Sequence, residues 1–314
     1  MVHYISFPKL FDWTLQTDPV AFHIFGWPIR WYGVILTAAF VLGGLYGVRR
    51  AKSFETDGDA VVDLLIAALP CAVLGARAYY VVHRWDYYGE HLNELFSIWK
   101  GGLAIYGGVI AGIITVVLFG RFNRRRFNTL SFLDLGSLGM LIGQSIGRWA
   151  NFVNGEAFGG PTSLPWGMSI SQSVQSASVL VHPTFLYESL WNLLGFVLLH
   201  WYSKRRKFRG ELFAWYGVWY GLGRGVIEGL RTDSLYVAGT DIRVSQALAF
   251  ATFAVGALFL VFMYVSRRYQ TAPALNLSCP GTLAGKQAAE LEEQGEAAAQ
   301  EGETDPGPES PPEE

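Results

Sequence analysis

Long apolar stretches separated by short polar segments run through most of this chain of 314 residues. Seven of the stretches approach the length of about 20 helical residues that crosses a bilayer core of about 30 Å. They lie near residues 30–49, 60–82, 103–120, 130–148, 184–202, 211–231 and 244–266. The pattern predicts an all-α polytopic membrane protein with about seven transmembrane helices.

The composition agrees with a membrane-embedded chain. Hydrophobic residues make up 51% of the sequence and charged residues only 16%, whereas a soluble domain carries about 25% charged residues. Many glycines lie inside the apolar stretches, among them Gly43, Gly44, Gly107 and Gly108. Small residues at these positions favour close contact between membrane helices.

Residues 271–314 differ sharply from the rest of the chain. They hold 10 of the 26 acidic residues and one of the 24 basic residues, which leaves residues 1–270 with 23 basic and 16 acidic residues. The segment has no aromatic residue, so it cannot bury enough apolar surface to offset the entropy lost on folding. The sequence therefore predicts a membrane domain over residues 1–270 and a disordered acidic tail over residues 271–314.

The connections between the apolar stretches alternate in basic content. Arginines and lysines gather near residues 49–52, 121–126, 204–209 and 267–268, and the intervening connections hold few. Because cytoplasmic loops attract these residues, we expect the N-terminus outside and the tail in the cytoplasm. On this orientation the turn-rich residues 149–182 form a small cap on the outer face. Residues 1–28 lack the basic start and apolar run of a cleavable signal peptide.

Arg148 follows an apolar stretch directly, in the segment GRWANFVNGE of residues 147–156. A charged residue at the centre of a spanning helix costs about 2.5–3.5 kcal/mol, so it normally pairs internally or marks a functional site. A guanidinium offers paired donors that match phosphate oxygens, and Asn151, Asn154 and Glu156 follow closely. The alternative is a purely structural ion pair of Arg148 with Glu156 or Asp134.

A second polar cluster lies in the sixth apolar stretch. A spacing of four places Tyr220, Arg224 and Glu228 on one side of a helix, with Arg231 three residues further along. Such a side must face a polar cavity or the charges of another helix. The alternative is that Arg224 and Glu228 only neutralise each other.

Three single residues are weaker candidates. Tyr32 lies just inside the first stretch, Tyr106 enters the third stretch between glycines, and His182 precedes the fifth. The alternatives are an interfacial aromatic belt, a packing role for the glycines, and a hydrogen-bonded structural histidine.

Three segments together, GRWANFVNGEAFG, HPTFLYE and YGLGRGVIEGLR, resemble the bacterial prolipoprotein diacylglyceryl transferase family. The resemblance runs in order over residues 30–266. It implies a seven-helix inner-membrane enzyme that moves the diacylglyceryl group of phosphatidylglycerol onto the lipobox cysteine of a preprolipoprotein and releases glycerol phosphate. The partners it implies are this lipid, the signal peptide with its lipobox cysteine, and the membrane.

The resemblance also implies roles for residues. Arg148 matches the phosphatidylglycerol-binding arginine of the family, and Tyr32 a functional tyrosine of the first span. Tyr106 departs from the pattern, because some members carry there a histidine proposed as the base. Together with the weaker candidates Tyr106 and His182, which the resemblance does not supply, the predicted catalytic residues are Arg148, Arg224, Tyr32, Tyr106 and His182. The implied phosphatidylglycerol-binding residues are Arg148, Asn151, Gly155, Glu156, Tyr220, Glu228 and Arg231.

The implied reaction is a nucleophilic displacement at a glyceryl carbon. It needs a route for the thiol proton, since the thiolate is the nucleophile, and cations for the charge that builds on the departing phosphate. We expect Arg148 to hold that phosphate, Arg224 to share this role or lower the pKa of the thiol, and Glu228 to orient an arginine. The base stays open between Tyr106, Tyr32 and His182, and a tyrosine with a pKa near 10 is a poor base unless a cation lowers that pKa.

Two other classes of protein compete with this interpretation. A lipid or anion transporter would need polar groups toward both membrane faces, whereas the polar clusters here gather toward one. An intramembrane protease would need a Ser/His, paired-Asp or HExxH arrangement, which Asp63 and Asp134 do not supply. The sequence has no metal-ligand spacing and no nucleotide-binding loop, so we expect no cofactor and no nucleic-acid partner.

Overall fold

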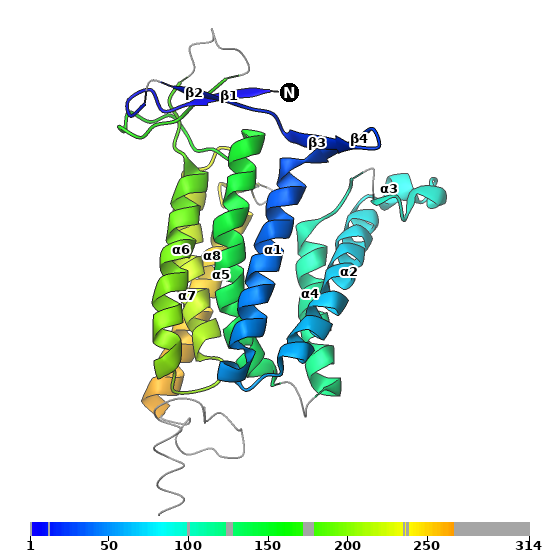
Figure 1. Ribbon diagram of the computed structural model, residues 1–314, viewed down its shortest axis with the longest axis vertical. Helices are drawn as coiled ribbons and strands as arrows, with labels where there is room; N and C mark the ends of the chain where they lie inside the picture. The colour runs from blue at the N-terminus through cyan, green and yellow to red at the C-terminus, as the bar shows by residue number, and fades with distance from the viewer. Residues whose placement is uncertain are drawn as a thin grey trace, which may run out of the picture.

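The computed structural model describes residues 2–11, 13–98, 101–123, 128–171, 179–234, 236 and 239–266. The tail predicted for residues 271–314 lies outside these residues. The described part contains seven helices of 18 or more residues, which lie alongside one another in Figure 1. They are α1 (Trp31–Arg50), α2 (Gly58–His83), α4 (Ile105–Phe122), α5 (Thr129–Asn154), α6 (Thr184–Tyr202), α7 (Glu211–Glu228) and α8 (Val244–Ser266).

The mostly helical architecture is therefore confirmed. Four helical segments are long and apolar enough to cross a membrane by length and composition, namely Trp31–Phe54, Gly58–His83, Thr129–Asn154 and Val244–Ser266. The apolar part of α4, Tyr106–Phe122, is shorter than this criterion. Helices α6 and α7 carry buried polar side chains, including Glu188, Asn192 and Glu228, and such side chains lower the hydropathy of a helix.

The prediction of an all-α chain is wrong at the N-terminus. Strands β1 (His3–Ser6) and β2 (Thr14–Thr17) form a three-stranded antiparallel sheet with β5 (Ser169–Ser171), and β3 (Val20–Ile24) forms a hairpin with β4 (Trp27–Arg30). Both sheets lie at the end of the bundle where α1 begins (Figure 1). The strands have at most five residues, too few for their alternation to stand out beside long apolar helices.

The first residues of the chain are fixed to the cap by pairing across a large sequence distance. Ile5 lies opposite Ile170 in the antiparallel register. Its side chain is fully buried, in a cluster with Met168 and Phe185 from the start of α6. Residues 3–6 therefore belong to the same cap as part of the segment 149–182 that the sequence indicated.

Helix α5 lies at the centre of the bundle and packs on α1, α6 and α7. Leu135, Leu138 and Leu141 are essentially fully buried. One turn further along, Ser145 Oγ donates to the Ser189 carbonyl and Ser189 Oγ donates to the Ser145 carbonyl, each at 2.9 Å. Such small side chains let helix backbones approach closely, and this contact fixes the height of α6 relative to α5.

Candidate active site

The end of α5 is fixed by a glycine that no other residue replaces easily. Gly155 has a φ of +63° and caps the helix, with its N–H pointing at the Asn151 and Phe152 carbonyls. A Cβ added there would also lie 2.9 Å from the His3 ring. Gly155 was predicted to bind phosphatidylglycerol. The structure gives it this backbone role, which places Arg148, Asn151 and Glu156 around one helix end.

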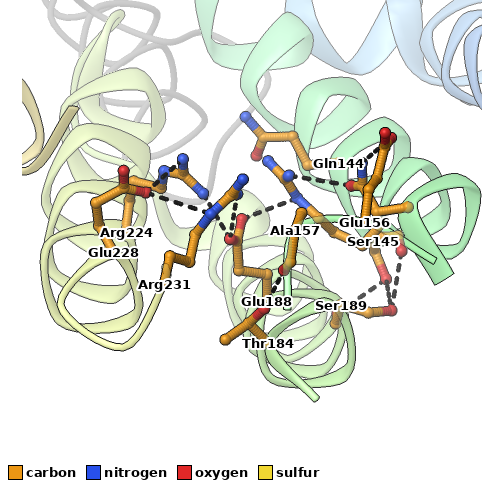
Figure 2. A network of polar contacts seen from close by, with 12 residues as sticks. Gln144, Ser145, Glu156, Ala157, Thr184, Glu188, Ser189, Arg224, Glu228 and Arg231 are labelled. Atoms are coloured by element: carbon orange, nitrogen blue, oxygen red, sulfur yellow. Dashed lines mark hydrogen bonds and ion pairs between the residues drawn. The ribbon is translucent and has the colours of Figure 1, made fainter. Parts of the chain in front are cut away.

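Glu188, on the first turn and a half of α6, is the carboxylate on which the arginines converge (Figure 2). Its side chain is only 4% exposed. Glu188 Oε2 lies 2.8 Å from Arg148 Nε, and Glu188 Oε1 lies 2.5 Å from Arg224 Nη1. Arg231 Nη1 lies 3.8 Å from the same Oε1 atom. One buried carboxylate thus joins three helix ends.

Glu228, the last residue of α7, is the second buried carboxylate and is 3% exposed. Its Oε2 atom lies 2.6 Å from Arg224 Nη2 and 3.9 Å from Arg231 Nε. Arg224 therefore bridges Glu188 and Glu228. The pairing of Arg224 with Glu228 that the sequence suggested is present, but Arg224 has Glu188 as a further partner.

Arg231 does not continue the side of α7 as predicted, because the helix ends at Glu228. Its guanidinium instead returns to the cluster from the following turn and also binds Asp233 through two hydrogen bonds of 2.9 and 2.8 Å. The hydrogen bonds from Arg231 hold the pKa of the Asp233 carboxyl below its ordinary value.

The two structural partners considered for Arg148 are occupied elsewhere. Asp134 is fully buried and accepts hydrogen bonds from the Gly210 and Phe213 N–H groups at the start of α7, at 2.9 and 3.0 Å. Glu156 accepts from Asn151 Nδ2 at 3.0 Å and from Asn154 Nδ2 at 3.5 Å. Arg148 touches this second group only through a 3.3 Å hydrogen bond from Nη1 to Asn151 Oδ1.

The charges of the cluster balance, and Arg148 is its most exposed arginine. Three guanidinium groups face the buried carboxylates of Glu188 and Glu228 and the half-exposed carboxylate of Asp233, so the buried charges are paired. The side chain of Arg148 is 22% exposed, against 14% for Arg224 and 12% for Arg231. Arg148 is thus the arginine of this cluster that an incoming anion reaches first.

The predicted aromatic candidates lie outside the ion-paired cluster within the described residues. Tyr32 on α1 and Tyr106 on α4 are each 37% exposed, and the Tyr106 ring lies 6.5 Å from that of Tyr79. Tyr220 stacks on Tyr216 with ring centroids 5.6 Å apart. It lies one turn before Arg224, at the contact of α7 with α5.

His182 is held within the cap. Its N–H donates to the Gly160 carbonyl at 3.1 Å, and its carbonyl accepts from the Gly159 N–H at 2.9 Å. Its Nδ1 lies 3.3 Å from the Tyr187 hydroxyl, which also accepts a 2.8 Å hydrogen bond from Trp166 Nε1. These bonds favour the structural role considered for this histidine.

Two side chains at this site were missed from the sequence. Glu188 lies in the quoted segment HPTFLYE, where its acidic charge one turn into an apolar helix was the available signal. Arg243 precedes α8 and donates to the Glu228 carbonyl at the end of α7. Within the described part of the chain, no group of three or more His, Cys, Asp or Glu side chains is placed to hold a metal ion.

The fold and the cluster together define a membrane protein with a buried arginine–carboxylate site near one end of a helical bundle. The sequence matches the family described as Prolipoprotein diacylglyceryl transferase over residues 19–262. The chain belongs to this family, which confirms the resemblance found in the sequence.

Three relatives illustrate the match, each bearing the name phosphatidylglycerol–prolipoprotein diacylglyceryl transferase. The protein of Finegoldia magna is 44% identical over 245 residues, covering 78% of this chain and 95% of the relative. The protein of Lysinibacillus sphaericus is 40% identical over 269 residues, covering 83% and 96%. The protein of Streptococcus uberis is 40% identical over 260 residues, covering 82% and 98%.

Proposed function

We propose that this chain transfers the diacylglyceryl group of phosphatidylglycerol to the lipobox cysteine thiol of preprolipoproteins, the first step of bacterial lipoprotein maturation. The cysteine sulfur forms a thioether bond to the glyceryl carbon, the carbon–oxygen bond to phosphate breaks, and glycerol phosphate leaves. Family membership and the names of the relatives support the reaction. The structural observation that carries it is the convergence of three arginines on Glu188, with Arg148 the most exposed of them.

Arg148 binds the phosphate of the lipid in this proposal. Its Nε atom is engaged by Glu188, which fixes the plane of the guanidinium, and its Nη1 makes only a long contact with Asn151. The remaining N–H donors of the Arg148 guanidinium are therefore held in a fixed orientation and are still free to bind the phosphate. A second negative charge develops on the phosphate as the carbon–oxygen bond breaks, and a preorganised cation stabilises that charge.

Arg224 supports the same charge from α7. Glu188 and Glu228 hold its two Nη atoms, so the guanidinium is positioned before substrate arrives. Asn151, Glu156, Tyr220, Glu228 and Arg231 complete the proposed lipid site, and Gly155 shapes its backbone. Of the three candidate bases, His182 is bound within the cap, whereas Tyr32 and Tyr106 keep partly exposed rings.

The proposed orientation places all seven long helices across the bacterial inner membrane. The cap and the arginine–carboxylate cluster lie at one end of the bundle, and the lysines and arginines of residues 49–52 and 204–209 lie at the other. Because basic residues favour the cytoplasmic side, the cap and the N-terminus are outside. The reaction then takes place at the outer face, and residues 271–314 are cytoplasmic.

The test of the phosphate-binding role is Arg148→Lys, assayed with phosphatidylglycerol and a lipobox peptide. Lysine keeps the charge and loses the paired donors, so we expect kcat/KM to fall by at least about tenfold, equivalent to about 1.4 kcal/mol. The matched control is Arg121→Lys, an exposed arginine at the opposite end of the bundle, which should retain wild-type turnover.

Wild-type turnover by Arg148→Lys protein that is folded and inserted would refute this role. The competing transporter class is tested in the same assay, because the purified wild-type protein should modify the peptide in detergent without any gradient.

A further inference from the structure

The end of the bundle opposite the cap carries a surface of exposed cations. We call this surface, made of six side chains, the basic end. All six are exposed. They come from the last turns of α1 and α4, the segment after α1, and the connection between α6 and α7: Arg49, Lys52, Arg121, Lys204, Arg205 and Lys207.

Contacts join several of the helix ends that carry the basic end. Arg50 Nη2 donates to Ser203 Oγ at 3.1 Å, which joins the end of α1 to the end of α6. Lys207 Nζ lies 4.7 Å from the centre of the Tyr264 ring, in the last turn of α8. Lys207, one of the six cations, therefore lies beside the last turn of α8, which ends at Ser266, the last described residue.

Two carboxylates at this end of the bundle, Glu55 and Glu211, are engaged by other groups. Glu55 binds Arg209 through its Oε2 atom, and Arg206 Nη2 lies 3.8 Å from its Oε1 atom. Glu211 is fully buried and accepts a 2.6 Å hydrogen bond from the Tyr202 hydroxyl. None of the six cations of the basic end forms an ion pair with a carboxylate of the described residues. Their charge is thus available to an anionic partner.

The remaining chain supplies such a partner by composition. Residues 271–314 carry ten acidic residues and one lysine. The first acidic residue, Glu290, follows Ser266 by 24 residues, a stretch that spans at most about 80 Å when fully extended. The longest helices of the bundle, of 26 residues, are only about 39 Å long. The linker is therefore long enough for the acidic residues to reach the basic end. Covalent attachment also gives the two partners an effective concentration in the millimolar range.

We propose that the acidic C-terminal segment of this chain, residues 290–314, binds the basic end of its own membrane domain. The bound segment covers cations that would otherwise contact anionic lipid headgroups of the inner leaflet. The interaction lies at the opposite end of the bundle from the arginine–carboxylate cluster, so it does not depend on the proposed reaction.

The test is carbodiimide coupling of carboxylates to lysine amines in the full-length protein, in neutral detergent, with linked peptides identified by mass spectrometry. We expect links from the glutamates at 290, 292, 293 and 296 to Lys52, Lys204 or Lys207. Raising the salt from about 0.1 M to about 1 M should reduce the links at least about fivefold, because the Debye length falls from about 10 Å to about 3 Å. Lys9, in the cap at the other end, is the internal control and should remain unlinked.

Arginine variants change the charge of the basic end without changing the lysines that the carbodiimide reaction couples. Arg49→Gln combined with Arg205→Gln removes two cations of the basic end and leaves every reactive lysine in place, so we expect the links to fall several-fold. Arg84→Gln is the matched control, since Arg84 is an exposed arginine at the cap end of α2, and it should leave the links unchanged.

Four results would overturn the proposal. These are the absence of links, equal linking to Lys9, links that ignore salt, and links found only between isotopically distinct chains, which would assign the partner to a second copy. Repeating the coupling in nanodiscs with about one third anionic lipid decides between the segment and the membrane. If the links are lost in anionic nanodiscs and kept in neutral ones, the basic end binds lipid headgroups in an anionic membrane and does not bind the acidic segment there.

Discussion

Glu188 on α6 brings together three arginines from the ends of α5 and α7 while itself remaining almost completely buried. Removing one partner from a buried ion pair leaves uncompensated charge, which costs about 3–5 kcal/mol in the strongest cases. Here Arg148 and Arg224 would both lose the acceptor that sets their orientation. A substitution at Glu188 should therefore affect the reaction through the arginines, although Glu188 is a positioning residue in the proposed mechanism.

We expect Glu188→Gln to lower kcat/KM by about 10- to 100-fold, corresponding to about 1–3 kcal/mol for a lost charged hydrogen-bond partner. The amide keeps the size of the side chain, so the helices should still pack. The measurement is transfer to a lipobox peptide at several lipid concentrations, together with Tm in detergent. Glu156→Gln, a change at the exposed carboxylate near the same helix end, should lower Tm less. Unchanged kcat/KM in folded Glu188→Gln protein would rule out the positioning role.

The sequence made Arg148 and Arg224 visible because a cation in an apolar stretch is conspicuous. It did not reveal their shared partner. Glu188 precedes Arg224 by 36 residues and lies on a different helix, so no local spacing links the two. The sequence shows where the charged residues are, but which of them form ion pairs depends on how α5, α6 and α7 pack.

At the scale of elements, the seven long helices could be placed from apolar length to within a few residues, with the exception of the end of α5. The sequence ended that span at residue 148, whereas the helix continues to Asn154. The extra turn and a half follows Arg148 and includes Asn151 and Asn154, which interrupt the apolar pattern. The Gly155 cap ends the helix there. The strand β1 escaped prediction because it has only four residues, and of its two partners β2 is equally short and β5 is distant in sequence.

This cap gives a direct prediction for Gly155→Ala. Alanine is strained at a φ of +63°, and its Cβ would lie 2.9 Å from the His3 ring. We therefore expect a loss of stability of about 1–3 kcal/mol, seen as a lower Tm, and a fall in transfer activity as Asn151 and Glu156 move. Gly160→Ala is the matched control, because a Cβ there meets nothing within 4 Å. Equal Tm values for the two variants would show that the cap geometry does not restrict residue 155.

At the scale of the whole molecule, the helices form two groups that are held together by different contacts. Helices α5, α6 and α7 share the ion-paired cluster, and α8 packs closely on α7. Helices α2 and α4 form a separate tight pair, held by small residues. A Cβ at Gly75 would lie 2.7 Å from the Gly107 carbonyl oxygen, and one at Gly107 would overlap the Gly75 carbonyl oxygen. The sequence indicated Gly107 as a packing position, but it did not indicate its partner Gly75 or show which helices the two join.

The α2–α4 pair offers a test of whether this half of the molecule takes part in transfer. Gly107→Ala forces the two helices apart at the residue next to Tyr106, and overpacking of this kind costs about 1–3 kcal/mol. If Tyr106 acts on the thiol or the lipid, kcat should fall more than the change in Tm explains, while Gly112→Ala on the same helix, where a Cβ meets nothing within 4 Å, should leave both unchanged. Comparison with Tyr106→Phe then separates the hydroxyl from its placement. A lower Tm with unchanged kcat in Gly107→Ala protein would mean that α2 and α4 support the fold without taking part in the chemistry, and Tyr32 on α1 and His182 in the cap would remain as candidates for the thiol base.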